Sequence, residues 1–178
     1  PDHRVDIAVV GGSLGGLTVA CLLADAGHEV VVYERSPSEL EERGAGIGFL
    51  PATSRYLVEH AGIRPDDVAV STGHIRYLTR DGMVAHDDEH RYLFSSWNTV
   101  YRQMLASFDR RAYRLAHELV DIDLESLTLG FANGVVIHPD LAVFAGFGLF
   151  EPLQIVVQLL LREPGRAVEP RQHLVLLA

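Results

Sequence analysis

A glycine-rich segment near the start of the chain has the residue types needed to hold a phosphate. It reads Gly11, Gly12, Ser13, Leu14, Gly15 and Gly16. Glycines let the backbone come close to an anion, and the first turn of a helix offers unpaired N–H groups and a favourable dipole. Glu34 follows at roughly the 20-residue offset at which a carboxylate accepts ribose hydroxyls. This spacing predicts dinucleotide binding, with a pyrophosphate against the helix and a ribose on Glu34.

Two strands and a helix must position these residues. An apolar run at residues 7–10 predicts the first strand, and a helical apolar pattern follows the glycines until Gly27 ends it. The β-branched run at residues 30–33 predicts a second strand that stops at Glu34. The order of strand, glycine turn, helix, strand and acid predicts a Rossmann-type βαβ unit. A glycine-rich turn that binds no ligand is the alternative.

Three positions of the turn correspond to the G-x-G-x-x-G pattern of dinucleotide-binding proteins. Gly11 permits the tight turn after the first strand, and Gly16 lets the helix pack closely against the sheet. Ser13 occupies the middle position, where the backbone approaches the pyrophosphate most closely. Its Cβ would crowd the phosphate, or its hydroxyl would donate a hydrogen bond to it, and the sequence allows both.

The composition is that of an ordinary globular protein with an acidic net charge. The 178 residues, 48% of them hydrophobic, can bury one core and part of another domain. A net charge of −9 argues against partners such as nucleic acid and anionic membranes. The sequence contains no lysine, which excludes Schiff-base chemistry. Cys21 falls on the predicted helix as a buried residue, and no secretory signal pattern opens the chain, which predicts a cytoplasmic protein.

The segment after Glu34 does not continue with a third parallel strand. Residues 44–51 form a second glycine-rich stretch, which predicts a loop able to approach a flat ligand. A helix is predicted over residues 53–60. Alternation at residues 74–79 and the turn residues 81–82 then predict a β-hairpin.

Residues 86–90 combine two histidines with three acidic residues. His86 and His90 are four positions apart, a spacing that permits metal binding on a helix. No helical pattern supports that arrangement here. We therefore predict a solvated loop and no metal site.

A further helix is predicted to begin near Thr99, with Asn98 as its N-cap. Arg102 lies in its first turns, and a guanidinium group is well suited to phosphate oxygens. A solvated surface arginine is the alternative. The β-type pattern of residues 113–138, with a turn at residues 133–134, predicts an antiparallel ribbon inserted after this helix.

The last part of the chain is strongly apolar between residues 141 and 161. Glu151 and Pro152 interrupt the middle of this run, which argues against a membrane span. A buried strand followed by a helix over residues 153–162 is the simpler prediction. The alternative is that residues 135–178 are an aberrant sequence that follows a truncation.

Four motifs in order resemble a known family. They are GGSLGGL, VVVYERS, ERGAGIGFLP and FSSWNTVYRQML. Together they resemble the N-terminal part of FAD-dependent aromatic hydroxylases of the para-hydroxybenzoate hydroxylase class, especially the 2,6-dihydroxypyridine 3-hydroxylase-like branch. The resemblance covers residues 5 to about 134. It implies an α/β fold, with a Rossmann-type βαβ FAD-binding domain over residues 1–134, an inserted antiparallel β ribbon, a largely missing substrate domain, and a degenerate continuation at 135–178.

The resemblance also implies a set of cofactor-binding residues. These are Gly11, Gly12, Ser13, Leu14, Gly15 and Gly16 at the pyrophosphate, Glu34 and Arg35 at the adenosine, Arg43, Gly44, Ala45, Gly46 and Ile47 towards the flavin, and Arg102 at the phosphates. In such a family NAD(P)H reduces the bound FAD, and oxygen then hydroxylates a small aromatic substrate. The flavin carries that chemistry, while protein groups bind, orient and exclude water.

The sequence departs from the family in ways that bear on activity. Gly146 stands where the family strand carries an aspartate, and the later glycine-aspartate motif and the substrate-binding sheet have no counterpart. We therefore expect a shortened or incomplete member, with a dimer or partner chain completing the FAD groove. The alternative is a non-catalytic nucleotide-binding or interaction protein. The sequence identifies no catalytic acid or base, and a plain NAD(P)-dependent dehydrogenase fits less well.

Overall fold

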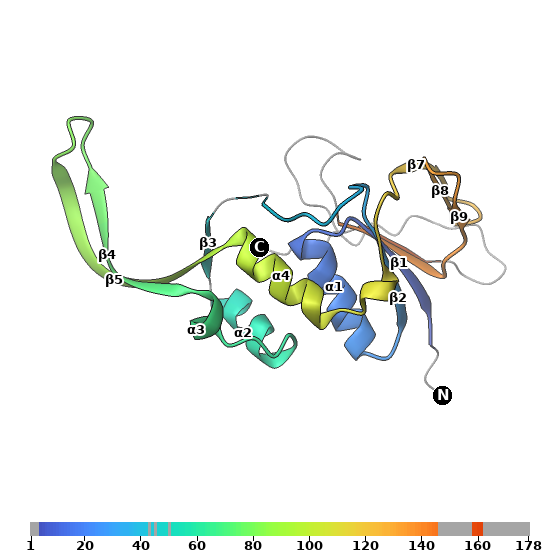
Figure 1. The fold of residues 1–178 in the computed structure, drawn as a ribbon, viewed down its shortest axis with the longest axis horizontal. Helices are drawn as coiled ribbons and strands as arrows, with labels where there is room; N and C mark the ends of the chain where they lie inside the picture. The colour runs from blue at the N-terminus through green and yellow to red at the C-terminus, as the bar shows by residue number, and fades with distance from the viewer. Residues whose placement is uncertain (1–3, 43, 45, 50, 146–157, 162–178) are drawn as a thin grey trace. The chain divides into compact units, whose positions relative to one another are not determined.

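The computed structural model describes residues 4–42, 44, 46–49, 51–145 and 158–161 (Figure 1). The chain divides into two compact units. Residues 1–40 and 104–178 belong to the first unit, and residues 41–103 belong to the second.

A mainly parallel sheet forms the centre of the first unit. Its strands are β1 (Asp6–Val10), β2 (Glu29–Tyr33), β6 (Tyr113–Arg114), β10 (Leu141–Phe144) and β11 (Gln158–Leu161), in the order β11-β10-β1-β2-β6. β1 pairs in parallel with both β2 and β10, so the strand order reverses at β1. Ligands of open α/β sheets bind at such a reversal, beyond the carboxyl ends of the strands.

The two faces of this sheet are covered differently. Helix α1 (Leu14–Asp25) packs on one face through Gly16, Leu17, Ala20 and Cys21. The three-stranded sheet of β7 (Leu119–Asp123), β8 (Thr128–Phe131) and β9 (Val136–Ile137) covers the other face (Figure 1).

Alternation along the strands assigns side chains to these two faces. Ala8 and Val10 of β1 join Ala142 and Phe144 of β10 in a buried cluster with the β7–β9 sheet. Val9 is fully buried and lies close to Gly16 of α1. The predicted α/β class and Rossmann-type βαβ unit are therefore confirmed.

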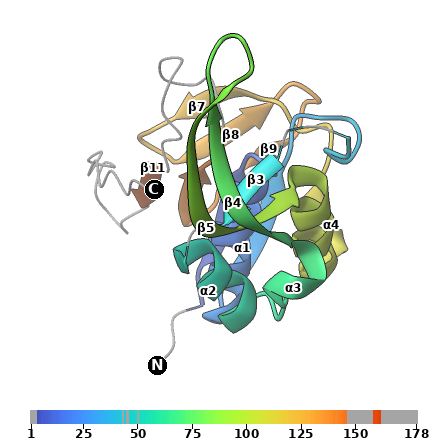
Figure 2. The same cartoon turned by 90° about the vertical axis from the view of Figure 1, so that its left-hand side faces the viewer.

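The second unit contains the other antiparallel sheet. Its strands β3 (Gly46–Phe49), β4 (Val70–Leu78) and β5 (Val84–Ser96) are arranged in the order β3-β5-β4, with β4 and β5 forming a long twisted hairpin (Figure 2). Helices α2 (Pro51–Glu59) and α3 (Pro65–Val68) belong to this unit, and α4 (Trp97–Ser107) begins in it.

Two predicted loops of this unit are strands in the structure. Residues 86–90 lie within β5, where Asp87 accepts a hydrogen bond of 2.8 Å from Arg76 Nε and contacts His74 Nδ1 at 3.1 Å. These cross-strand pairs stabilise the ribbon and explain why an acidic segment is extended. The second glycine-rich stretch is also partly a strand, because Gly46–Phe49 pairs with β5.

As predicted, no third parallel strand directly follows Glu34 in the described chain; the strand next to β2 is β6, which comes after the second unit in the sequence. Two more details of the prediction need correction. Residues 113–114 pair in parallel with β2 and are not part of an antiparallel ribbon. Residues 158–161 form β11, antiparallel to β10, and not the predicted helix over 153–162. A short apolar run fits either element, and pairing with the edge of β10 decides between them. Residues 153–157 and 162 lie outside the described residues.

Helix α4 begins earlier than the sequence predicts. Trp97 is its first residue, and the N–H of Thr99 donates a 3.0 Å hydrogen bond to Ser96 Oγ. Ser96 is therefore the N-cap, and Asn98 lies inside the helix, where its Oδ1 accepts from the N–H of Glu42 at 3.2 Å. The N-cap prediction at Asn98 is wrong, because the serine two residues earlier already satisfies the N–H of the third helical residue.

We expect Ser96→Ala to lower the free energy of unfolding by about 1 kcal/mol, the usual contribution of a serine N-cap. Urea denaturation followed by circular dichroism measures the change. Asn98→Ala is the matched control, expected to change stability by less than about 0.5 kcal/mol because its contact is exposed. A larger loss in Asn98→Ala than in Ser96→Ala would contradict the assignment of the cap.

Among the residues that the structure describes, no helix is both long and apolar enough to cross a bilayer. In the same part of the chain, no three His, Cys, Asp or Glu side chains gather in a way that would hold a metal ion.

Candidate nucleotide-binding site

The glycine turn directly joins β1 to α1. Gly11 has a φ of +107°, which favours glycine, and its N–H donates to the carbonyl of Tyr33 at 2.9 Å. A Cβ at Gly16 would lie 1.8 Å from the carbonyl oxygen of Gly11. Both glycines are therefore required for the helix to start so close to the end of the strand.

The amino end of α1 has no side-chain cap. Ser13 is the N-cap residue, with extended backbone, and within the described chain its side chain makes no capping hydrogen bond. The first-turn N–H groups of an α-helix have no intrahelical acceptor. A Cβ added at Gly15 would meet no described atom within 4 Å. The helix start thus offers N–H donors, a serine hydroxyl and open space, the features that an anion requires.

Glu34 faces this turn from the end of β2. Its side chain is buried, with a relative exposure of 6%. Oε2 accepts from the N–H of Gly12 at 2.8 Å, and Oε1 accepts from the N–H of Ser36 at 2.9 Å. The structure therefore brings Glu34 and the turn together, as their spacing predicts.

Tyr113 contacts the same turn from β6, and sequence analysis does not identify it. Its hydroxyl donates to the carbonyl of Gly12 at 2.8 Å across 101 positions of sequence. A Cβ at Gly12 would lie 2.2 Å from that hydroxyl oxygen. No spacing rule links two residues so far apart; the one available signal is a tyrosine at the start of a β-type segment.

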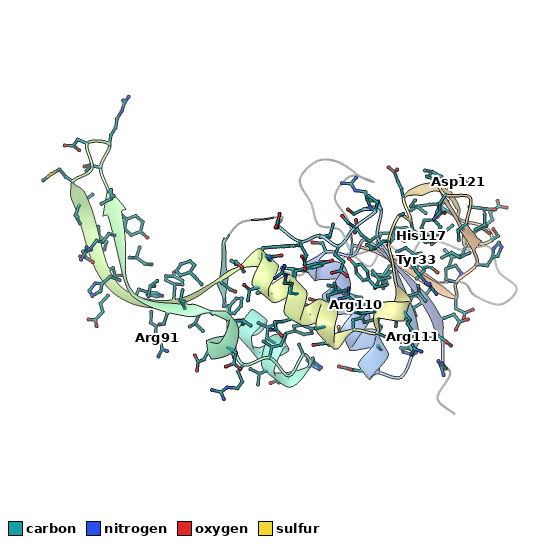
Figure 3. The ribbon with its side chains drawn as sticks, viewed as in Figure 1. Tyr33, Arg91, Arg110, Arg111, His117 and Asp121 are labelled. Carbon is teal, nitrogen blue, oxygen red and sulfur yellow. The ribbon has the colours of Figure 1, made fainter. Side chains whose placement is uncertain are left out.

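Three aromatic side chains pack together beside the backbone of Glu34. Tyr33 stacks on Phe131 with 4.9 Å between ring centroids, and His117 meets both rings edge-on. Tyr33 and His117 lie side by side in Figure 3. Burial raises the pKa of Tyr33, partly offset by the charge of Arg114. The N–H of His117 donates to the carbonyl of Glu34 at 2.9 Å. Glu34 is thus held through both its backbone and its side chain.

The other predicted cofactor-binding residues make no described contact with the glycine turn, and two of them lie outside the residues that the structure describes. Arg35 is exposed in the first unit. Gly46 and Ile47 lie on β3 of the second unit, and Gly44, with a φ of +91°, packs so closely on Trp97 that a Cβ would lie 2.7 Å from its ring. Arg43 and Ala45 lie outside the described residues.

Arg102 contacts a carboxylate of its own unit. Its Nε and Nη2 donate to the two oxygens of Glu41, each at 2.8 Å. The hydrogen bond lowers the pKa of Glu41 and raises that of the Arg102 guanidinium. Both side chains are largely exposed, so the pair can exchange with another anion.

The fold and the turn define the class of protein. A strand reversal, a glycine turn, an uncapped helix start and a buried acid at the end of β2 are the parts of a Rossmann-type dinucleotide-binding unit. A model of the NAD(P)-binding Rossmann-like domain matches residues 9–38.

The chain is similar in sequence to named FAD-dependent monooxygenases. The chain is 36% identical over 135 residues to a 2,6-dihydroxypyridine 3-monooxygenase of Paenarthrobacter nicotinovorans, covering 72% of this chain and 33% of that protein. It is 26% identical over 155 residues to an FAD-dependent monooxygenase of Nectria sp, with coverages of 78% and 35%. The solved structure of 2,6-dihydroxypyridine-3-hydroxylase from Arthrobacter nicotinovorans matches with a TM-score of 0.72 and 33% identity, over 78% of this chain and 36% of that one.

The chain is therefore homologous to the N-terminal part of FAD-dependent aromatic hydroxylases, and it spans about a third of the length of the relatives it matches. The resemblance found in the four sequence motifs is thereby confirmed.

Proposed function

We propose that this chain is the FAD-binding part of an aromatic-ring hydroxylase. The pyrophosphate of FAD would lie against the amino end of α1, and the adenosine ribose would bind to Glu34. The observation that carries the proposal is the buried Glu34 carboxylate facing the glycine turn beside an uncapped helix start. Relatives named as FAD-dependent monooxygenases support the choice of FAD over other dinucleotides.

The groups present fit the adenosine diphosphate half of FAD. Each carboxylate oxygen of Glu34 accepts one backbone N–H and keeps a further acceptor position, so both remain able to accept ribose hydroxyls. The uncapped N–H groups, together with the hydroxyl of Ser13, are donors for phosphate oxygens. Arg35 would lie beside the adenine, and Arg102 would exchange Glu41 for a phosphate.

The bound flavin would supply the redox chemistry, with NAD(P)H as its reductant. The residues of this chain bind the cofactor, orient it and shield it from water. By resemblance to the family, we also propose that the flavin contacts residues of the second glycine-rich segment, namely Arg43, Gly44, Ala45, Gly46 and Ile47. The substrate would be a small aromatic compound, and the protein would act in the cytoplasm. A second copy or a partner chain would complete the FAD groove.

Titration with FAD tests the proposal. We expect binding of one FAD per chain, seen as a change in flavin fluorescence, and displacement of FAD by ADP. At about 100 times its Kd, FAD stabilises the folded state by about 2.7 kcal/mol, which raises the thermal midpoint by roughly 5–10 °C. Riboflavin is the control ligand, because it lacks the phosphates and adenosine that this site would hold.

Two results would count against the proposal. Failure of FAD to bind would remove the cofactor assignment. FAD binding without NADPH oxidation, in the presence of hydroxylated pyridines or phenols, would favour the non-catalytic alternative, which the glycine at position 146 also favours.

A further inference from the structure

Both backbone polar groups of Gly12 are held by side chains from other elements. Its N–H donates to Glu34 Oε2 at 2.8 Å, and its carbonyl accepts from the Tyr113 hydroxyl at 2.8 Å. All three residues are buried. We propose that Tyr113 is a positioning residue of the nucleotide site, and that Tyr113, rather than any ligand, is the reason why position 12 must be glycine.

The dinucleotide-binding pattern does not itself require glycine at position 12. In G-x-G-x-x-G the glycine positions correspond here to Gly11, Ser13 and Gly16, and Gly12 occupies a variable position. The backbone of Gly12 is not left-handed, so its conformation is open to other residues. What excludes a side chain is the ring of Tyr113, whose Oη, Cζ and Cε2 would lie 2.2, 2.6 and 2.9 Å from a Cβ.

The strand register fixes where Tyr113 stands. β6 pairs in parallel with β2, and Tyr113 is opposite Val32. Glu34 follows β2 directly, and its N–H donates to the carbonyl of Arg114 at 2.8 Å. The two side chains that hold Gly12 therefore come from β6 and from the residue after β2, two segments hydrogen-bonded to each other, and together they support the turn.

This support has a consequence for ligand binding because the peptide bond is planar and trans. The carbonyl of Gly12 and the N–H of Ser13 belong to one peptide unit and point in opposite directions. By holding the carbonyl, Tyr113 also fixes the direction of the Ser13 N–H at the start of α1. A donor that is oriented before binding loses less freedom when the ligand arrives, so the hydroxyl of Tyr113 should increase affinity without contacting the ligand.

The first experiment removes the hydroxyl alone, and it rests on the proposed function. We expect Tyr113→Phe to weaken FAD binding about tenfold, because the Gly12 carbonyl loses its donor and the turn its fixed orientation. Tyr77→Phe, which removes an exposed tyrosine hydroxyl, is the control and should leave the Kd unchanged. Titrations are made at a temperature at which circular dichroism shows every variant folded. If the wild type binds FAD and Tyr113→Phe binds it equally well, the positioning role is overturned while the proposed function stands.

The second experiment needs no ligand and remains decisive if FAD does not bind. Gly12→Ala should lower the thermal midpoint by roughly 10 °C, as expected for overpacking of about 3 kcal/mol. Tyr113→Leu removes the ring, and adding Gly12→Ala to it should lower the midpoint by no more than about 2 °C further. An equal loss from Gly12→Ala in both backgrounds, or no loss in either, would overturn the claim that Tyr113 excludes a side chain at position 12.

Discussion

Gly16→Ala is expected to lower the free energy of unfolding by about 3 kcal/mol or more, and the thermal midpoint by roughly 10 °C. The new Cβ would lie 1.8 Å from the carbonyl oxygen of Gly11 and 3.5 Å from Val9 Cγ1. Neither neighbour can move easily. Gly11 is bonded to Tyr33, and the next residue, Gly12, is held by two side chains. Helix α1 must therefore shift away from β1, which opens the core on that face of the sheet.

Thermal and urea unfolding of the chain without ligand measure this effect, and Gly15→Ala is the matched control. A Cβ at Gly15 meets no described atom, and alanine is a better helix former than glycine. Gly15→Ala should therefore keep or raise stability, by up to about 1 kcal/mol. If the two substitutions have the same effect on the midpoint, the close approach of α1 to the turn is not what Gly16 provides.

The parts of the fold that could be predicted depend on short-range patterns. The βαβ unit follows from apolar runs, glycines and an acid within about 30 residues, which is the length scale on which local spacing determines structure. The hairpin around residues 81–82 follows from its turn residues in the same way. Such patterns need no knowledge of what lies next to them in space.

The errors concern segments whose structure is decided by distant partners. Residues 86–90 are extended because they pair with β4, where Arg76 faces Asp87, and residues 158–161 are a strand because β10 has an edge to pair with. Asn98 and Ser96 are both good N-cap residues, and propensity cannot choose between them. For the two strands the local sequence permits either structure, and pairing with a distant strand selects one. For the cap, the local hydrogen bond from the Thr99 N–H to Ser96 Oγ selects the serine.

The candidate site shows the same division. Glu34 is identified from its offset, since the length of a βαβ unit is nearly constant. Tyr113 is missed because β6 returns to the sheet only after the whole second unit, so no fixed spacing relates it to Gly12. The pair of Arg102 and Glu41 is missed for the same reason, although both residues belong to one unit. Local spacing finds the residues that we propose to face the ligand, whereas the residues that support the turn come from the tertiary structure.

Glu34→Gln is expected to destabilise the chain by about 3 kcal/mol and to weaken FAD binding by more than about tenfold. The carboxylate accepts two backbone N–H groups, one on each oxygen, in a buried position. A glutamine of the same shape has one acceptor oxygen and one NH2 group, so one backbone donor would face another donor. Hydrogen bonds to a charged group contribute about 1.5–3 kcal/mol each, and a buried donor without a partner adds to the loss.

Urea unfolding without ligand and FAD titration separate the two roles of this carboxylate. The control, Glu29→Gln at the start of β2, loses an exposed ion pair with Arg4 and should change stability by less than about 1 kcal/mol. An unchanged urea midpoint in Glu34→Gln would show that the two amide contacts do not stabilise the turn. A lower midpoint with unchanged FAD affinity in the folded fraction would make Glu34 a support for the turn and would remove the ribose from it. We expect Glu34→Gln to lower both the urea midpoint and the FAD affinity, because the same two oxygens hold the turn and remain able to accept the ribose hydroxyls.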